Sequence, residues 1–156
     1  MATNPSPETS FMSDRVFLDT NILVYAHDSA AGSKHMEAAE LVTSLWREGN
    51  PAISTQVLQE FYVMITHKVA RPVGADTARR WVARYLNWHV VANDGGAVLA
   101  AIDLQRQHQI SFWDALIIHA AAASKATILL SEDLNDGQLY QDVRVSNPFS
   151  SAPAAP

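Results

Sequence analysis

Four acidic residues occupy positions where a carboxylate could do chemistry: Asp19, Glu60, Asp114 and Asp133. Asp19 and Asp133 follow short apolar runs that are typical of β-strands, whereas Glu60 and Asp114 lie in the opening turns of predicted helices. Carboxylates that meet in space repel one another and raise one another's pKa unless a divalent cation neutralises them. A set of hard oxygen ligands of this kind indicates Mg²⁺ or Mn²⁺.

Each acid also has a purely structural explanation. Asp19 could cap the helix that begins after it, and Asp114, three residues after Ser111, has the spacing of a capping box. Asp133 lies in a turn-like segment, and Glu60 could be a glutamate at the rim of the apolar core. The metal-site hypothesis therefore depends on the four acids converging, not on any one of them.

Other kinds of site are excluded by composition. The chain has no cysteine, which rules out disulfides, thiolate nucleophiles and cysteine-bound metal centres. Its six histidines show no spacing typical of a zinc site, and its six glycines are too scattered to form a phosphate-binding loop.

The elements that must position the acids can be read from apolar periodicity. We predict strands at 15–18, 52–53, 89–92, 127–130 and 143–145, and helices at 33–48, 54–70, 75–88, 94–107 and 111–123, with a short helix after Asp19. Strands alternating with helices predict an α/β fold, in which a short, mostly parallel sheet has helices on both faces. Ligands of such sheets bind beyond the carboxyl ends of the strands, where Asp19 and Asp133 are expected.

The net charge of −5 conceals a basic segment. Between positions 68 and 84, five basic residues face one acid, Asp76, which leaves a local charge of +4; they are Lys68, Arg71, Arg79, Arg80 and Arg84. Such a cluster is consistent with binding to a phosphate backbone, and equally with a solvated helix face.

Four segments carry a resemblance to a known family: FLDTNILVYA, QVLQEFYV, SFWDALI and ILLSEDL. In order and separation they resemble the four motifs of PIN domains, and they are most similar to the VapC-type toxins of toxin–antitoxin systems. The resemblance extends from Val16 to about Val145 and implies a three-layer fold. It also implies Mg²⁺- or Mn²⁺-dependent hydrolysis of phosphodiester bonds in single-stranded or locally unpaired RNA.

The resemblance also assigns the site residues. It makes Asp19, Glu60, Asp114 and Asp133 the catalytic and metal-binding acids, with Asn21 and Ser131 supporting them. At the fourth position Asp136 is an alternative ligand, although the spacing favours Asp133. We expect Asp19 and Asp114 to hold a first ion, with Glu60 and Asp133 completing its shell or recruiting a second ion. Glu60 is the candidate for orienting or deprotonating the attacking water.

The expected organisation is a disordered extension at 1–13, a PIN-like nuclease domain at 14–147 and a disordered tail at 148–156. The resemblance implies a homodimer and inhibition by a small antitoxin; Trp81, Trp88 and Trp113 are candidates for apolar contacts, or else for ordinary packing. No apolar run is long enough to span a membrane, so we expect a soluble, cytoplasmic protein.

Two other functions remain open. One is an inactive PIN fold that binds RNA or protein. The other is a phosphoaspartate hydrolase with Asp19 as nucleophile, which the sequence fits poorly because Asn21 stands where a second aspartate is required.

Overall fold

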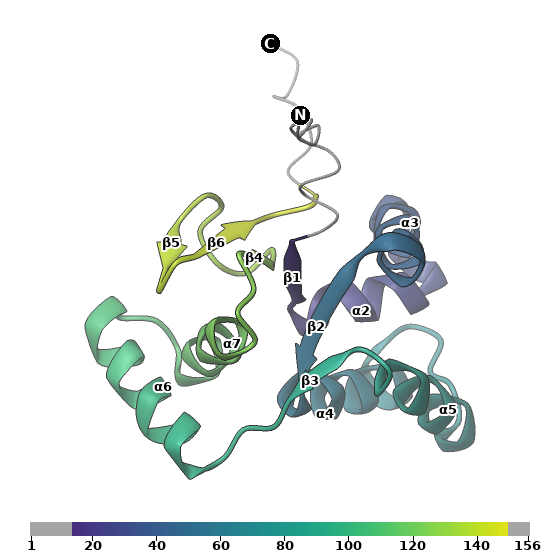
Figure 1. Cartoon of the computed structure of the whole chain (residues 1–156). Helices are drawn as coiled ribbons and strands as arrows, with labels where there is room; N and C mark the ends of the chain where they lie inside the picture. Colours follow the sequence, from purple (N-terminus) through teal and green to yellow (C-terminus); the bar gives the residue numbers. More distant parts are fainter. Residues whose placement is uncertain (1–13, 150–156) are drawn as a thin grey trace, which may run out of the picture.

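The computed structural model describes residues 14–149, which form a twisted sheet between two layers of helices (Figure 1). The strands are β1 (Arg15–Leu18), β2 (Asn50–Ser54), β3 (His89–Val91), β4 (Ile128–Leu130), β5 (Leu139–Tyr140) and β6 (Val143–Ser146). Their order is β3-β2-β1-β4-β6-β5, and every neighbouring pair is parallel except β5 and β6. The predicted, mostly parallel sheet is thus confirmed.

The α-helices are α2 (Thr20–His27), α3 (Ser33–Glu48), α4 (Thr55–Val63), α5 (Ala75–Tyr85), α6 (Gly95–His108) and α7 (Phe112–Ala123). A 3₁₀-helix η1 (Ser29–Ala31) and a π-helix η2 (Met64–Lys68) follow α2 and α4. In Figure 1, α6 and α7 lie on one side of the sheet and α2 to α5 on the other, which confirms the expected three-layer α/β fold.

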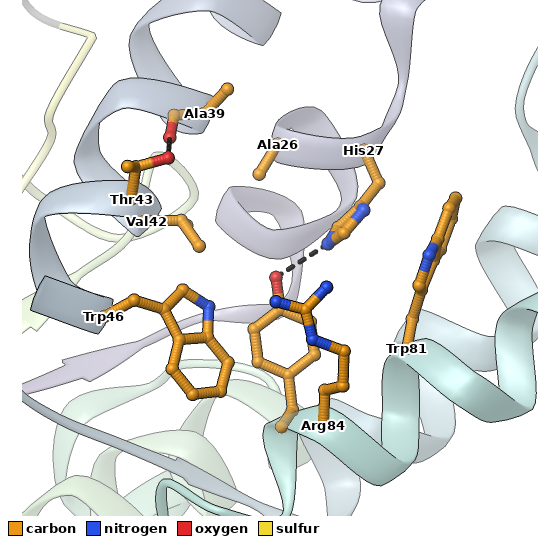
Figure 2. Close-up of a pocket in the computed structure, with 9 residues that line it drawn as sticks. Ala26, His27, Ala39, Val42, Thr43, Trp46, Trp81 and Arg84 are labelled. Carbon is orange, nitrogen blue, oxygen red and sulfur yellow. Dashed lines mark hydrogen bonds between the residues drawn. The ribbon is translucent and has the colours of Figure 1, made fainter.

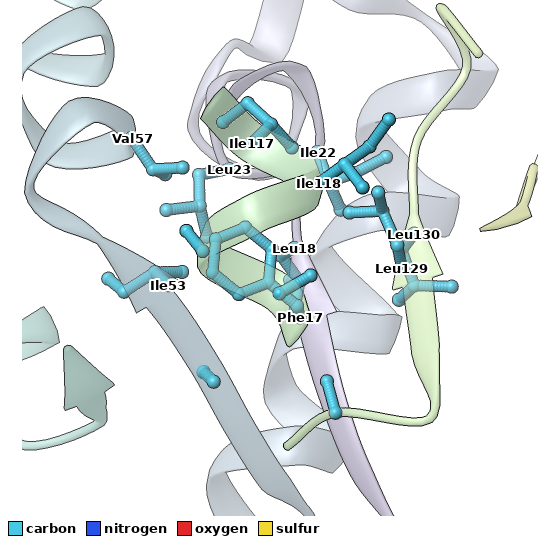
Figure 3. Close-up of a cluster of buried hydrophobic side chains, with 14 of the residues drawn as sticks. Phe17, Leu18, Ile22, Leu23, Ile53, Val57, Ile117, Ile118, Leu129 and Leu130 are labelled. Atoms are coloured by element: carbon cyan, nitrogen blue, oxygen red, sulfur yellow. The ribbon is translucent and has the colours of Figure 1, made fainter. Parts of the chain in front are cut away.

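The core is built from apolar side chains of the central strands and the helices that cover them (Figure 3). Phe17 and Leu129 on neighbouring strands are fully buried, as are Ile22 from α2 and Ile118 from α7. Because both faces of β1 and β4 are covered, these strands are continuously apolar instead of alternating. None of the helices within residues 14–149 combines the length and the hydrophobicity that a transmembrane span requires.

The order of the strands creates a switch point beside β1. The chain leaves β1 through α2 and α3 to reach β2 on one side, whereas β4, which pairs with the other side of β1, is reached only after α7. In open α/β sheets, ligands bind in the crevice at the carboxyl end of such a switch point. Here that crevice lies beyond Leu18 and Leu130, which are partners in the sheet register.

The structure departs from the predicted elements in three places. The helix predicted to reach residue 70 changes to a π-helix at Met64, and the chain leaves this helix at Val69, whose backbone N–H donates to the Met64 carbonyl at 3.1 Å. The helix predicted to end at residue 88 ends at Tyr85, because Asn87 donates to the Arg84 carbonyl at 2.9 Å and closes a turn. Strand β5 was not predicted at all.

Two further predictions concern the terminal segments of the chain and the exposure of three tryptophan side chains. The predicted extension at 1–13 and residues 150–156 of the predicted tail lie outside the described residues, whereas Phe149 packs edge-on against Tyr25 with ring centroids 5.4 Å apart. Of the two roles considered for Trp88, the structure supports ordinary packing, because the side chain is buried against Trp46 and Tyr85. Trp81 is partly buried, and Trp113 is 61% exposed.

Candidate active site at the carboxyl edge of the sheet

Asp19 lies at the carboxyl end of β1, where its backbone N–H still donates to the Leu130 carbonyl of β4 at 2.9 Å. One carboxylate oxygen accepts the Thr20 N–H at 2.7 Å and caps α2, and the other accepts the Ser131 hydroxyl at 2.8 Å. The residue is only 6% exposed. Burial raises the pKa of Asp19 from 3.8 to about 6, with smaller contributions from the charges of Asp133 and Asp114, against the two hydrogen bonds. Asp19 is therefore both a helix cap and a carboxylate held under electrostatic strain.

Asp133 follows β4 and approaches the same crevice from the neighbouring strand. Its N–H donates to the Ser131 hydroxyl oxygen at 3.2 Å, and its carboxylate accepts the Asn21 side-chain amide at 2.9 Å. Partial burial, followed by the charges of Glu132 and Asp114, raises the pKa of Asp133, against the hydrogen bond from Asn21. Asn21 and Ser131 thus contact the acids that they were expected to support.

The alternative fourth acid lies elsewhere. One carboxylate oxygen of Asp136 accepts the Asn147 backbone N–H at 2.9 Å, which ties the loop after β4 to the end of β6. Of the two candidates for the fourth position, Asp133 contributes, together with Asp114, to the raised pKa of Asp19. This proximity favours Asp133 for the fourth position.

Asp114 reaches the crevice from the first turn of α7. The Ser111 hydroxyl oxygen caps this helix by accepting the Asp114 N–H at 3.0 Å, so the backbone of Asp114 takes part in the cap and its side chain is available. Its negative charge contributes to the raised pKa of Asp19 and of Asp133. Three of the predicted acids, Asp19, Asp114 and Asp133, therefore lie within electrostatic range of one another.

Glu60 joins this group through neighbours that the sequence did not single out. Its carboxylate accepts the Thr20 hydroxyl at 2.6 Å and the Gln56 side-chain amide at 3.0 Å. Thr20 is the residue after Asp19, so Glu60 is one hydrogen bond away from the capped acid. The Gln56 spacing of four residues on one helix is the only sequence signal that could have indicated either contact.

Within residues 14–149, no three side chains of Asp, Glu or His are arranged closely enough to hold a metal ion as they stand. The chemistry of the donor set nevertheless fits a hard divalent cation, because it consists of carboxylates and one of them carries a burial cost that a cation would relieve. A bound ion would have to draw these side chains together.

A second polar cluster borders the site. Lys34 forms an ion pair with Glu132 at 2.7 Å, and the same glutamate accepts a short hydrogen bond from the Tyr25 hydroxyl. The Lys34 ammonium also lies 5.1 Å from the centre of the Tyr25 ring. These contacts fix the loop that carries Asp133 to α2 and α3, and the sequence reading missed them.

The predicted basic residues are all exposed but do not share one face. Lys68 lines a groove together with Glu60 and Trp113, whereas Arg79 lines a neighbouring hollow between α4 and α5. Arg84 lies on another side of α5, over the Trp46 ring at 5.8 Å.

Arg84 lines a cavity of about 180 Å³ between α2, α3 and α5, shown in Figure 2. His27 forms a 2.7 Å hydrogen bond with the Tyr85 hydroxyl there and stacks on Trp81 at 4.4 Å between ring centres. Burial, reinforced by the charges of Arg84 and His35, lowers the pKa of His27 to about 4, so its imidazole is neutral at pH 7. None of the four predicted acids lines this cavity.

One comparison with known proteins identifies the family. Residues 16–138 match the family model of the PIN domain. A comparison with curated protein sequences gives no match.

Solved structures of similar fold include three from toxin–antitoxin systems. A toxin–antitoxin complex from Klebsiella pneumoniae is 17% identical over 86% of this chain and 98% of that chain, with a TM-score of 0.63. VapBC2 from Rickettsia felis, bound to a promoter DNA fragment, is 19% identical over 85% of this chain and 98% of that chain, with a TM-score of 0.60. VapC20 of Mycobacterium tuberculosis, a toxin that cleaves the sarcin–ricin loop, is 18% identical over 73% of this chain and 86% of that chain, with a TM-score of 0.59. At these identities the likeness concerns the fold.

Proposed function

Because the chain belongs to the PIN domain family, we propose that it is a divalent-metal-dependent endoribonuclease that uses Asp19, Glu60, Asp114 and Asp133. The observation that carries the proposal is the buried Asp19 carboxylate at the switch point of the sheet, with a pKa raised to about 6 and two further acids in electrostatic range. A protein gains no stability from gathering unpaired carboxylates, so their proximity favours a functional explanation.

Asp19 and Asp114 are proposed to hold the ion, with Glu60 and Asp133 completing its surroundings. When bound, Mg²⁺ or Mn²⁺ would supply an activated water and would offset the negative charge that develops on the phosphate. Ser131 and Thr20 hold Asp19 in place through 2.8 Å and 2.7 Å hydrogen bonds, and Asn21 holds Asp133. Glu60 is held by Thr20 and Gln56 and is the candidate for orienting the attacking water.

The RNA backbone is proposed to bind along the basic segment, which comprises Lys68, Arg71, Arg79, Arg80 and Arg84. Lys68 supports this most directly, because it lines the same groove as Glu60. Contacts of this kind position the chain of phosphates and carry little sequence information.

We further propose that the protein is the toxin of a VapBC-type pair, inhibited by a small antitoxin, and that it forms a homodimer. The similar solved structures of toxin–antitoxin complexes support the pairing. For the dimer, α6 exposes three apolar side chains, Val98, Leu99 and Ile102, which a second copy could cover.

The test is RNA cleavage by Asp19→Asn in Mg²⁺ or Mn²⁺. The variant keeps the shape and the cap but removes the charge, so cleavage should fall by at least about 100-fold while the fold is retained. Asp142→Asn is the matched control, because Asp142 is exposed on the β5–β6 turn, and it should cut at the wild-type rate. Undiminished cleavage by Asp19→Asn would remove Asp19 from the site.

A further inference from the structure

A groove leads away from the acids along α4 and the start of α7. It has a volume of about 510 Å³ and is lined by Gln56, Gln59, Glu60, Val63, Met64, Lys68 and Trp113. This size is within the range of pockets that bind small ligands. Glu60 belongs both to the groove and to the group of acids. In an RNA that is cut at the acids, the nucleotide next to the scissile phosphate would therefore lie at the groove.

The largest exposed apolar surface in this groove is the indole of Trp113. Its side chain is 61% exposed, although it directly precedes Asp114 in a helix whose following residues are buried. An edge-to-face contact with Phe112, with ring centres 5.2 Å apart, orients the indole. Tryptophan is costly to expose, and an oriented indole beside a nuclease site offers a flat face on which a nucleobase can stack.

The polar residues of the groove complement a nucleotide. The described chain has one ion pair, between Lys34 and Glu132, so Lys68 has no acid bound to it and can meet a phosphate. Gln56 is buried, with an exposed fraction of 4%. Its side-chain oxygen has no hydrogen-bond partner among the described residues, while its amide nitrogen donates to Glu60 at 3.0 Å and to the Trp113 carbonyl at 3.3 Å.

An unsatisfied buried amide oxygen is unfavourable unless something pairs with it. Here Gln56 links the candidate catalytic Glu60 to the backbone of Trp113, so a ligand on the indole would be coupled to the acid group through one side chain.

We propose that this groove is a nucleotide subsite in which Trp113 stacks on the unpaired base next to the scissile phosphate and Lys68 binds the adjoining backbone phosphate. The inference rests on the proposed ribonuclease function and assigns the residues that would hold the unpaired base and its phosphate beside the cut. A base can lie flat on the indole only after leaving its own stack, so the substrate must be single-stranded or locally unpaired at the cut.

The experiment measures binding of labelled single-stranded RNA to proteins that carry Asp19→Asn, so that cleavage does not interfere. In this background Trp113→Ala should weaken binding roughly 5- to 150-fold, and Trp113→Phe, which keeps an aromatic face, should lose much less. Lys68→Gln should weaken binding and reduce its salt dependence. Met36→Ala and Lys125→Gln are the matched controls, because both residues are exposed away from the groove, and neither should change the affinity.

A series of RNAs with one abasic nucleotide at each position tests the stacking directly. At one position the missing base should weaken binding to the Asp19→Asn parent as much as Trp113→Ala does, and should cause no further loss in the Trp113→Ala protein. In the active protein, Trp113→Ala should raise KM more than it lowers kcat.

Two results would overturn the subsite. One is an affinity of Trp113→Ala that is unchanged for every RNA. The other is a Trp113→Ala protein that keeps its affinity for RNA but no longer sediments as a dimer, which would make the groove a contact between copies of this chain. If the proposed ribonuclease function itself is wrong, the wild-type protein will neither cut nor bind RNA. This result distinguishes that failure from a failure of the subsite alone. Retained folding of Trp113→Phe, checked by circular dichroism, ensures that a loss in the alanine variant can be interpreted.

Discussion

At the scale of single residues, Asp19 combines a favourable helix cap with an unfavourable burial of charge. Its position could be predicted because it directly follows an apolar strand, and Asp133 comes three residues after the end of another. The contacts of Thr20 and Gln56 with Glu60 could not, because these partners meet only when α2 and α4 pack together. The sequence reading thus found acids whose neighbours along the chain mark them, and missed groups whose partners are set by the fold.

Removing the charge of Asp19 should stabilise the metal-free protein at neutral pH. The folded-state pKa of about 6 lies above the unfolded value of 3.8, so the folded state binds the proton more tightly and loses stability as pH rises from about 4 to 6. The difference between these two pKa values corresponds to about 3 kcal/mol of lost stability at neutral pH. An asparagine at this position would recover only part of it, because Thr20 and Ser131 form weaker hydrogen bonds with a neutral amide than with a carboxylate. In EDTA at pH 7.5, Asp19→Asn should therefore raise the free energy of unfolding by about 1–3 kcal/mol, measured by urea denaturation. A destabilised variant would show that the hydrogen bonds that the charged carboxylate accepts from Thr20 and Ser131 outweigh the cost of burying its charge.

His27 should act in the opposite direction over a similar pH range. Its folded-state pKa of about 4 lies below the ordinary value of 6.5, so the unfolded state binds the proton more tightly and stability falls as pH decreases from about 6.5 to 4. Since Asp19 masks this effect, the measurement belongs in the Asp19→Asn background. There, stability should decline through that range, and adding His27→Gln should flatten the profile. An equally steep profile after that substitution would assign the acid sensitivity to another group.

At the scale of elements, strands and helices were predicted wherever an apolar run or a cap marks them. The helices predicted to begin at Ser54 and Ser111 are capped by these residues, whose hydroxyl oxygens accept the Val57 and Asp114 N–H groups. Strand β5 was missed because its turn to β6 uses Gln141 and Asp142 at φ 46° and 67°, where Asn-Gly is the usual signal. The π-helix η2 was not predicted, because no periodic pattern in the sequence distinguishes it from a continuing α-helix.

The cap of α7 should be important because this helix carries both Asp114 and Trp113. Ser111→Ala removes the acceptor of the Asp114 N–H and should lower the free energy of unfolding by about 1 kcal/mol. Ser33→Ala is a suitable comparison, because Ser33 opens α3 without a side-chain cap, and it should change stability by less than about 0.5 kcal/mol. Equal effects of the two substitutions in thermal denaturation would mean that the Ser111 cap contributes nothing specific.

At the scale of the whole molecule, a chain of net charge −5 must bind a polyanion through a local basic surface. If the basic segment binds the RNA backbone, replacing Arg79 and Arg80 with glutamine should weaken binding and reduce the slope of log affinity against log salt by about 1.4, two contacts at ~0.7 each. Arg47 and Arg106 are exposed arginines outside the segment, so their double replacement controls for net charge. The same decrease in slope with both pairs would indicate a general charge effect.

If the acids at the carboxyl edge of the sheet meet around one hard divalent ion, calorimetric titration with Mn²⁺ should detect its binding. Wild type and Asp142→Asn should take up Mn²⁺, whereas Asp19→Asn and Asp114→Asn should lose most of the uptake. Below pH 6 the wild-type heat should also depend on the buffer, because binding releases the proton from Asp19. Absence of uptake by the wild type, or equal uptake by all four proteins, would show that these acids do not share an ion.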